Sequence, residues 1–109
     1  MEIKNKIWFE SKGQMVLSLG SVMLLKKIDA TGSLRSAATD LKMSYQKARK
    51  LMQYCNENSD NKVLITQVGG ADGGGTKLTE YGKKLVQLYD DILKINQTFL
   101  NEQFEKLQQ

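Results

Sequence analysis

Side chains able to bind an anionic polymer are concentrated between residues 31 and 53. This stretch holds five cations and one acid, Asp40, whereas the whole 109-residue chain has a net charge of only +4. The cations are Arg35, Lys42, Lys47, Arg49 and Lys50. A localised positive field favours a polyanionic partner, although a solvated helix face can have the same composition.

Catalytic chemistry has few candidate residues in this chain. There is no His and one Cys, Cys55, which argues against His-based triads, Cys–His nucleophiles and ordinary zinc sites. Asp90 and Asp91 are neighbours on a predicted helix and point in different directions. A single Cys fits a reducing cytoplasm, and no apolar run approaches the ~18 residues of a membrane span. We therefore expect no enzyme activity, no metal or cofactor, no membrane contact and a cytoplasmic location.

Two hairpins are predicted at the two sides of a helical segment. Alternating apolar residues predict a strand over 3–10, and after a turn Met15-Val16-Leu17 returns as a short second strand. Later, the segment 63–68, which is rich in β-branched and apolar residues, and the segment 76–79 predict two strands. The glycine-rich loop 69–75 joins them.

Three helices are predicted between the hairpins, and a fourth follows them. The first begins at Gly20-Ser21 and ends near Thr31-Gly32, and the next two are capped by Ser33 and Ser44. Thr79 caps a helix that runs almost to the C-terminus. The third helix has its buried side formed by Ala48, Leu51, Met52 and Cys55. We expect one α+β unit, with residues 1–79 forming a winged helix-turn-helix and residues 80–109 a dimerisation helix of the same domain.

The order helix, tight turn, helix, strand, glycine loop, strand is typical of a winged helix-turn-helix. Its recognition helix spans about residues 44–56, and its wing spans residues 69–77. Arg can pair with guanine and Gln with adenine in the major groove, while Ser and Lys can contact phosphates or base edges. Glycines in the wing let the backbone approach a sugar-phosphate chain. The outward side chains of the recognition helix are Tyr45, Gln46, Lys47, Arg49, Lys50 and Gln53.

Four segments of the chain resemble the N-terminal domain of molybdate-responsive ModE-type regulators, which are related to the LysR-type winged helix-turn-helix. They are Gly32-Ser33-Leu34-Arg35-Ser36-Ala37-Ala38, Met43-Ser44-Tyr45-Gln46-Lys47-Ala48, the glycines from Gly69 to Gly75, and Leu78-Thr79-Glu80-Tyr81-Gly82. The hairpin around Lys6-Ile7-Trp8-Phe9-Glu10 also resembles that of short, free-standing members. The resemblance implies a dimeric transcription regulator.

The resemblance and the outward residues together give a set of expected DNA contacts. They are Ser33, Arg35, Ser44, Tyr45, Gln46, Lys47, Arg49, Lys50, Gly73, Gly74 and Lys77. Two positions depart from the family pattern. Arg49 stands where the family has Trp, so base preference differs, and Ala71-Asp72 replaces an often basic wing position. Full-length members carry a C-terminal molybdate-binding region, which is absent after Gln109, so we expect no molybdate binding.

The last helix carries a heptad seam of apolar residues spaced alternately three and four apart from Leu78 to Phe99. Beyond Ile92 little of the domain is left to cover such residues. The apolar residues expected to be wet in a monomer are Leu93, Phe99, Leu100, Phe104 and Leu107. Exposed apolar patches of this size mark an interface, although the first half of the seam can pack within its own domain. We expect a two-fold homodimer. Its predicted contacts are Leu85, Leu88, Ile92, Ile95, Phe99 and Leu100.

The favoured function is sequence-specific binding of double-stranded DNA in transcription control. Two alternatives remain open on the sequence: a winged-helix adaptor for protein partners, and a ligand sensor without direct DNA binding. Charge discriminates the first of them, because an adaptor should tolerate acidic substitutions at Lys47 and Lys50 and a DNA-binding protein should not.

Overall fold

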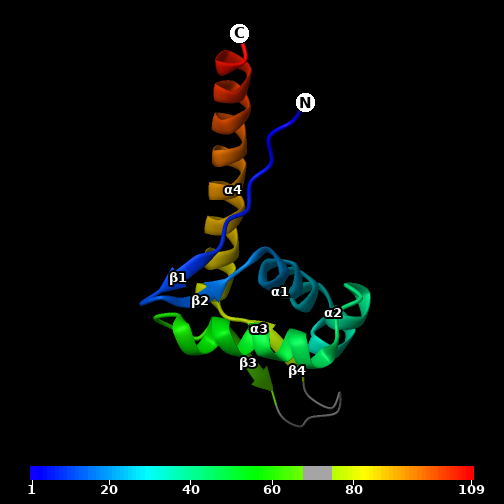
Figure 1. Cartoon of the computed structure of the whole chain (residues 1–109). Helices are drawn as coiled ribbons and strands as arrows, with labels where there is room; N and C mark the ends of the chain where they lie inside the picture. Colours follow the sequence, from blue (N-terminus) through cyan, green and yellow to red (C-terminus); the bar gives the residue numbers. More distant parts are fainter. Residues whose placement is uncertain (68–74) are drawn as a thin grey trace.

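The described part of this computed structural model, residues 1–67 and 75–109, folds as a hairpin, three helices, a second hairpin and a long helix (Figure 1). The elements are β1 (Phe9–Ser11), β2 (Gln14–Leu17), α1 (Leu19–Thr31), α2 (Leu34–Asp40), α3 (Tyr45–Asn58), β3 (Leu64–Gln67), β4 (Gly75–Leu78) and α4 (Glu80–Leu107). This order confirms the predicted α+β, winged-helix architecture. Among the described residues, no helix combines the length and the hydropathy that a bilayer span requires.

Helix boundaries follow from local capping chemistry. Side-chain oxygens of Ser18, Ser33, Ser44 and Thr79 each accept a backbone N–H from the first turn of α1, α2, α3 and α4, respectively. Such caps satisfy one of the otherwise free amides of a helix. Gly32 ends α1 because it adopts a left-handed φ of 74° and donates its N–H to the Ile28 carbonyl at 2.7 Å.

The hydrophobic core joins the two hairpins to one face of each helix. On α3 this is the predicted buried side, whereas on α4 the buried apolar residue is Tyr89, which does not belong to the predicted seam. Its buried apolar residues are Val16, Leu17, Val22, Leu24, Leu25, Ile28, Ala37, Ala38, Ala48, Met52, Cys55, Val63, Leu64, Leu78 and Tyr89. Small residues at 37, 38 and 48 keep α2 and α3 close. The core therefore fixes how α3 is presented at the surface.

The two hairpins are both antiparallel, but the first is shorter than its sequence pattern predicted. β1 pairs with β2, and β3 pairs with β4 with Ile65 opposite Lys77. A strand over residues 3–10 was predicted, yet strand pairing begins only at Phe9. Residues 1–8, named the strap below, do alternate between exposed and half-buried from residue 2 onward. They alternate because they lie along a helix, not along another strand.

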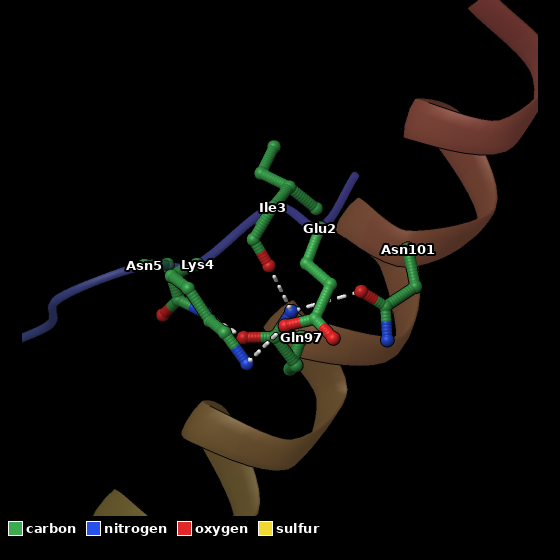
Figure 2. Close-up of polar contacts among 6 residues, drawn as sticks. All are labelled: Glu2, Ile3, Lys4, Asn5, Gln97 and Asn101. Atoms are coloured by element: carbon green, nitrogen blue, oxygen red, sulfur yellow. Dashed lines mark hydrogen bonds and ion pairs between the residues drawn. The ribbon is translucent and has the colours of Figure 1, made fainter. Parts of the chain in front are cut away.

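The strap runs beside the projecting half of α4 and is held there by polar side chains of that helix (Figures 1 and 2). Gln97 accepts a hydrogen bond from the Asn5 side chain and donates one to the Ile3 carbonyl at 3.0 Å. Nearer the domain, the Tyr89 hydroxyl donates to the Ile7 carbonyl at 2.9 Å. Burial, and secondly the neighbouring Asp90, raise the pKa of Tyr89, so this hydroxyl keeps its proton at neutral pH.

The position of the strap shows that the expected exposure of three residues of α4 was wrong. Leu93, Leu100 and Phe104 are half-buried in the single chain, not wet, because they lie on the face of α4 away from the seam. Phe104 shares a small hollow with strap residues Met1 and Ile3, and Leu93 shares another with Asn5 and Ile7. The sequence offered no long-range pattern that would place the strap there.

Candidate nucleic-acid interface

The outward face of α3 contains every polar side chain that the sequence assigned to it. Tyr45, Gln46, Lys47, Arg49, Lys50 and Gln53 are exposed, whereas Ala48, Met52 and Cys55 point into the core. Between Ser44 and Gln53 this face has three cations and no acid. A helix that has one buried face and one cationic, exposed face can approach a polyanion without disturbing the core.

The start of α3 is capped by Ser44. Its Oγ accepts the Lys47 backbone N–H at 3.1 Å, so the hydroxyl hydrogen remains available to donate outward. Ser33 acts in the same way on α2, accepting the Ser36 N–H at 3.1 Å, but it is half-buried. The capping role explains both serines structurally, whatever else they contact.

Arg35 on α2 lies over the ring of Tyr45 in the first turn of α3. The guanidinium carbon is 4.2 Å from the ring centroid, which is a cation–π contact. This contact joins the two helices at the exposed surface and limits the orientations of both side chains. Sequence reasoning placed both residues in the interface but did not pair them, because no spacing rule links positions ten residues apart across a turn.

The strands of the second hairpin are attached to the helix-turn-helix at the α1–α2 turn. The Thr76 N–H donates to the Gly32 carbonyl at 3.0 Å, and a Cβ built on Gly75 would come within 2.8 Å of the same oxygen. Gly75 is therefore required by this close approach. Lys77 is exposed on β4. Gly73 and Gly74, with the rest of 68–74, lie outside the described residues.

A groove of about 350 Å³ separates α3 from β3 and β4. Arg49 lines it together with Gln53 and Glu57, and the Gln53 amide donates to the Glu57 carboxylate at 2.9 Å. Asn56 fixes the floor, because its Oδ1 accepts the backbone N–H groups of Val63 and Leu64 at 2.8 and 2.9 Å. Arg49 thus stands between the helix and the second hairpin.

The five cations of residues 31–53 make no ion pair with any carboxylate of the described residues. The ion pairs of the structure join Glu2 to Lys4, Lys26 to Asp90, and Glu80 to Lys83. These five cations are therefore not neutralised by direct ion pairs within the described part of the chain. An external anion can supply the missing partners.

The described residues contain no cluster of three or more His, Cys, Asp or Glu side chains that could hold a metal ion. Cys55 is fully buried, and burial raises the pKa of its thiol to about 11 even though a hydrogen bond with Ser21 opposes the shift. A thiol with this pKa is uncharged at neutral pH and a poor nucleophile.

The seam of α4 is open at the surface over its middle section. Exposed fractions are 51% for Leu88, 40% for Ile92, 65% for Ile95 and 57% for Phe99. Leu85 and Leu100 are half-buried. Where the seam meets the domain, a groove of about 500 Å³ lies between the first hairpin and α4, with walls that include Phe9, Val16 and Tyr81.

Comparison with known proteins yields a consistent group of relatives, although no family model matches the chain. Over 69 residues, 63% of this chain and 27% of the relative, it is 44% identical to the transcriptional regulator ModE of Haemophilus influenzae. Over 76 residues, 70% of this chain and 29% of the relative, it is 38% identical to the DNA-binding transcriptional dual regulator ModE of Escherichia coli K12. The molybdenum transport protein ModE of Azotobacter vinelandii is 32% identical over 91 residues, 84% of this chain and 34% of the relative.

The chain spans about a third or less of the length of these relatives. The matches nevertheless extend over most of the chain, which folds as the resemblance implied. The chain therefore carries a ModE-type domain, homologous to part of the ModE transcriptional regulators.

Proposed function

We propose that this protein is a sequence-specific, double-stranded-DNA-binding transcription regulator that inserts α3 into the major groove. The main support for the proposal is the outward face of α3, where Lys47, Arg49 and Lys50 are exposed. No acidic residue lies between Ser44 and Gln53 on this face. Relatives that share this domain are named as transcriptional regulators, and one is named as DNA-binding.

Each side chain of this face has a chemistry suited to duplex DNA. Arg49 can pair bidentately with guanine and Gln46 with adenine, while Lys47 and Lys50 can neutralise phosphates. The Arg35–Tyr45 contact orients a second guanidinium beside the first turn of α3. Base contacts of this type supply sequence discrimination, and the lysine contacts supply salt-dependent affinity.

The second hairpin would act as the wing, on the backbone beside the groove that receives α3. Its position is supported by the hydrogen bond between Thr76 and Gly32, which ties β4 to the helix-turn-helix. Lys77 is the exposed cation of the described wing strands. We assign Gly73 and Gly74 to backbone contacts on sequence grounds alone.

The dimer would form through the open seam of α4. An antiparallel pairing centred between Ile92 and Ile95 sets Leu88 of one copy against Phe99 of the other, next to the groove beside the first hairpin. The same register brings Lys84 near Glu105 of the second copy at flanking heptad positions. A parallel pairing offers no opposite charges at these positions, so the antiparallel arrangement is favoured.

A charge-reversal experiment tests the function. Replacing Lys47→Glu together with Lys50→Glu should abolish the salt-sensitive gel shift of duplexes taken from upstream of the protein's own coding sequence. Each lost phosphate contact should also reduce the slope of log affinity against log salt by about 0.9. The matched control reverses Lys4→Glu and Lys94→Glu, two exposed lysines outside the proposed interface, and should retain the shift.

The outcomes separate the function classes. Equal binding by both double variants would contradict a role for α3 in DNA contact. A wild-type protein that shows no salt-sensitive shift would favour the adaptor. Circular dichroism of all variants shows whether the fold is retained.

A further inference from the structure

A cavity of about 400 Å³ lies behind α3, between that helix, the strap and the start of α1. Its volume falls within the range of small-molecule sites in proteins. The apolar part of its wall is formed by Ile7, Trp8, Met15, Leu19, Met43 and Leu51. Trp8 and Leu19 are 47% and 50% exposed, so part of this apolar wall is open to solvent.

The charged residues that line this cavity are both cations, Lys6 and Lys47. Both are exposed, and neither is in an ion pair within the described part of the chain. The nearby carboxylate of Glu10 is not part of the wall, and it accepts the indole N–H of Trp8 at 2.5 Å. The indole N–H is therefore already hydrogen-bonded, and the ring of Trp8 is the part available for contact with a ligand.

A larger hollow of about 620 Å³ adjoins the first and shares Lys6, Ile7 and Leu19 with it. Its wall includes the carboxylate of Asp90, which is paired with Lys26 at 2.9 Å, and it has no contact with α3. The mixed charge selects no ligand class, whereas the cavity behind α3 has apolar walls and two amines of one sign.

We propose that the cavity behind α3 binds a small planar, apolar ligand that carries one anionic group, of the aromatic carboxylate or sulfonate class. The ring system would pack between Trp8 and Leu51, and the anionic group would pair with Lys6 and Lys47. Lys47 also belongs to the face assigned to DNA, so a bound anion competes with a phosphate for the same amine. This last consequence rests on the proposed function, whereas binding of the ligand does not.

Two dyes that differ by one sulfonate test the proposal. Trp8 is the only tryptophan of the chain, so energy transfer from it reports a dye bound nearby. We expect saturable transfer to 8-anilinonaphthalene-1-sulfonate and weaker binding of neutral N-phenyl-1-naphthylamine. Lys6→Gln should weaken binding of the sulfonate about two- to fivefold, the range for a partly exposed ion pair, and leave the neutral dye unchanged. Lys4→Gln, at an exposed strap lysine outside the cavity, is the matched control and should change neither dye.

A filling variant tests the location independently of charge. A Cβ on Gly20 would point toward Leu51 and Met43, at 3.6 and 3.8 Å from their terminal carbons, so Gly20→Leu places a side chain in the cavity. Binding of both dyes should be lost in that variant. Equal affinity for the two dyes, an equal effect of Lys4→Gln and Lys6→Gln, or unchanged transfer in folded Gly20→Leu would overturn the proposal. Gel shifts are also measured in the absence of dye. A loss of DNA binding can then be distinguished from an absence of dye binding in this cavity.

Discussion

At the scale of single residues, several positions of the ModE-like pattern are explained by packing. Gly82 lies on α4 directly against the Val63 carbonyl, and a Cβ there would fall far inside contact distance of that oxygen. The same carbonyl accepts the Thr79 N–H at 2.9 Å, so it cannot easily move away. Thr79 and Gly82 together fix the start of α4 against Val63, the residue before β3, and this packing role does not depend on any contact with DNA.

Two helical glycines should respond in opposite ways to alanine. Gly82→Ala should lower the free energy of unfolding by about 1–3 kcal/mol, as expected for overpacking against backbone. Gly20→Ala meets side-chain carbons at ordinary distances, so the better helix propensity of alanine should stabilise the protein by up to about 1 kcal/mol. Urea unfolding of both variants measures the difference. An equal loss of stability in the two would contradict this account of Gly82.

Alkaline pH should destabilise the protein through Cys55. The thiol pKa of about 11 in the fold exceeds its ordinary value of 9.0, so the unfolded chain loses this proton first as pH rises. The free energy of unfolding should therefore fall between pH 9 and 11, by roughly 2–3 kcal/mol at most from this group. Cys55→Ser has no thiol to ionise and keeps a hydroxyl for Ser21. Subtracting its pH profile also removes the parallel effect of Tyr89, and a wild-type curve matching the variant would refute the assignment.

At the scale of elements, the sequence predicted what depends on local patterns. The predicted helices correspond to α1 to α4, and the predicted caps Ser33, Ser44 and Thr79 cap α2, α3 and α4. No cap was predicted for α1, which begins at Leu19 after Ser18, one residue before the predicted start at Gly20-Ser21. Residues 3–8 show the limit of that reasoning. Their alternation looked like a strand, but the alternation arises from packing along α4 through Gln97 and Tyr89, which are about ninety residues distant in sequence. Contacts of this kind are set by tertiary structure, and no periodicity encodes them.

The open seam of α4 gives the prediction for this scale. Ile95→Glu places a charge at the centre of the proposed helix pair, where it would be desolvated, and should convert a dimer into a monomer of 12.3 kDa. Lys94→Glu introduces the same side chain one position away, outside the seam, and should leave the dimer intact. Light scattering at micromolar concentration measures both masses. A monomeric wild-type protein would rule out the proposed dimer.

At the scale of the whole molecule, the sequence predicted the individual residues of the candidate site better than it predicted how those residues come together. Exposed residues of α3 followed from helical periodicity once Ala48 and Met52 were taken as buried. The stacking of Arg35 on Tyr45 and the position of Arg49 in a groove beside β3 and β4 depend on how separate elements meet. Under the proposed function, those relations would decide which bases each guanidinium can reach.

In the proposed dimer, one molecule and its copy present two α3 helices to one stretch of duplex DNA. Selection of bound duplexes from a random pool tests this arrangement, with the Lys47→Glu, Lys50→Glu variant selected in parallel. We predict enrichment of two half-sites related by two-fold symmetry and separated by about one helical turn, 10–10.5 base pairs. The variant should enrich nothing. An unenriched wild-type pool, or the same motif selected by the variant, would contradict the account.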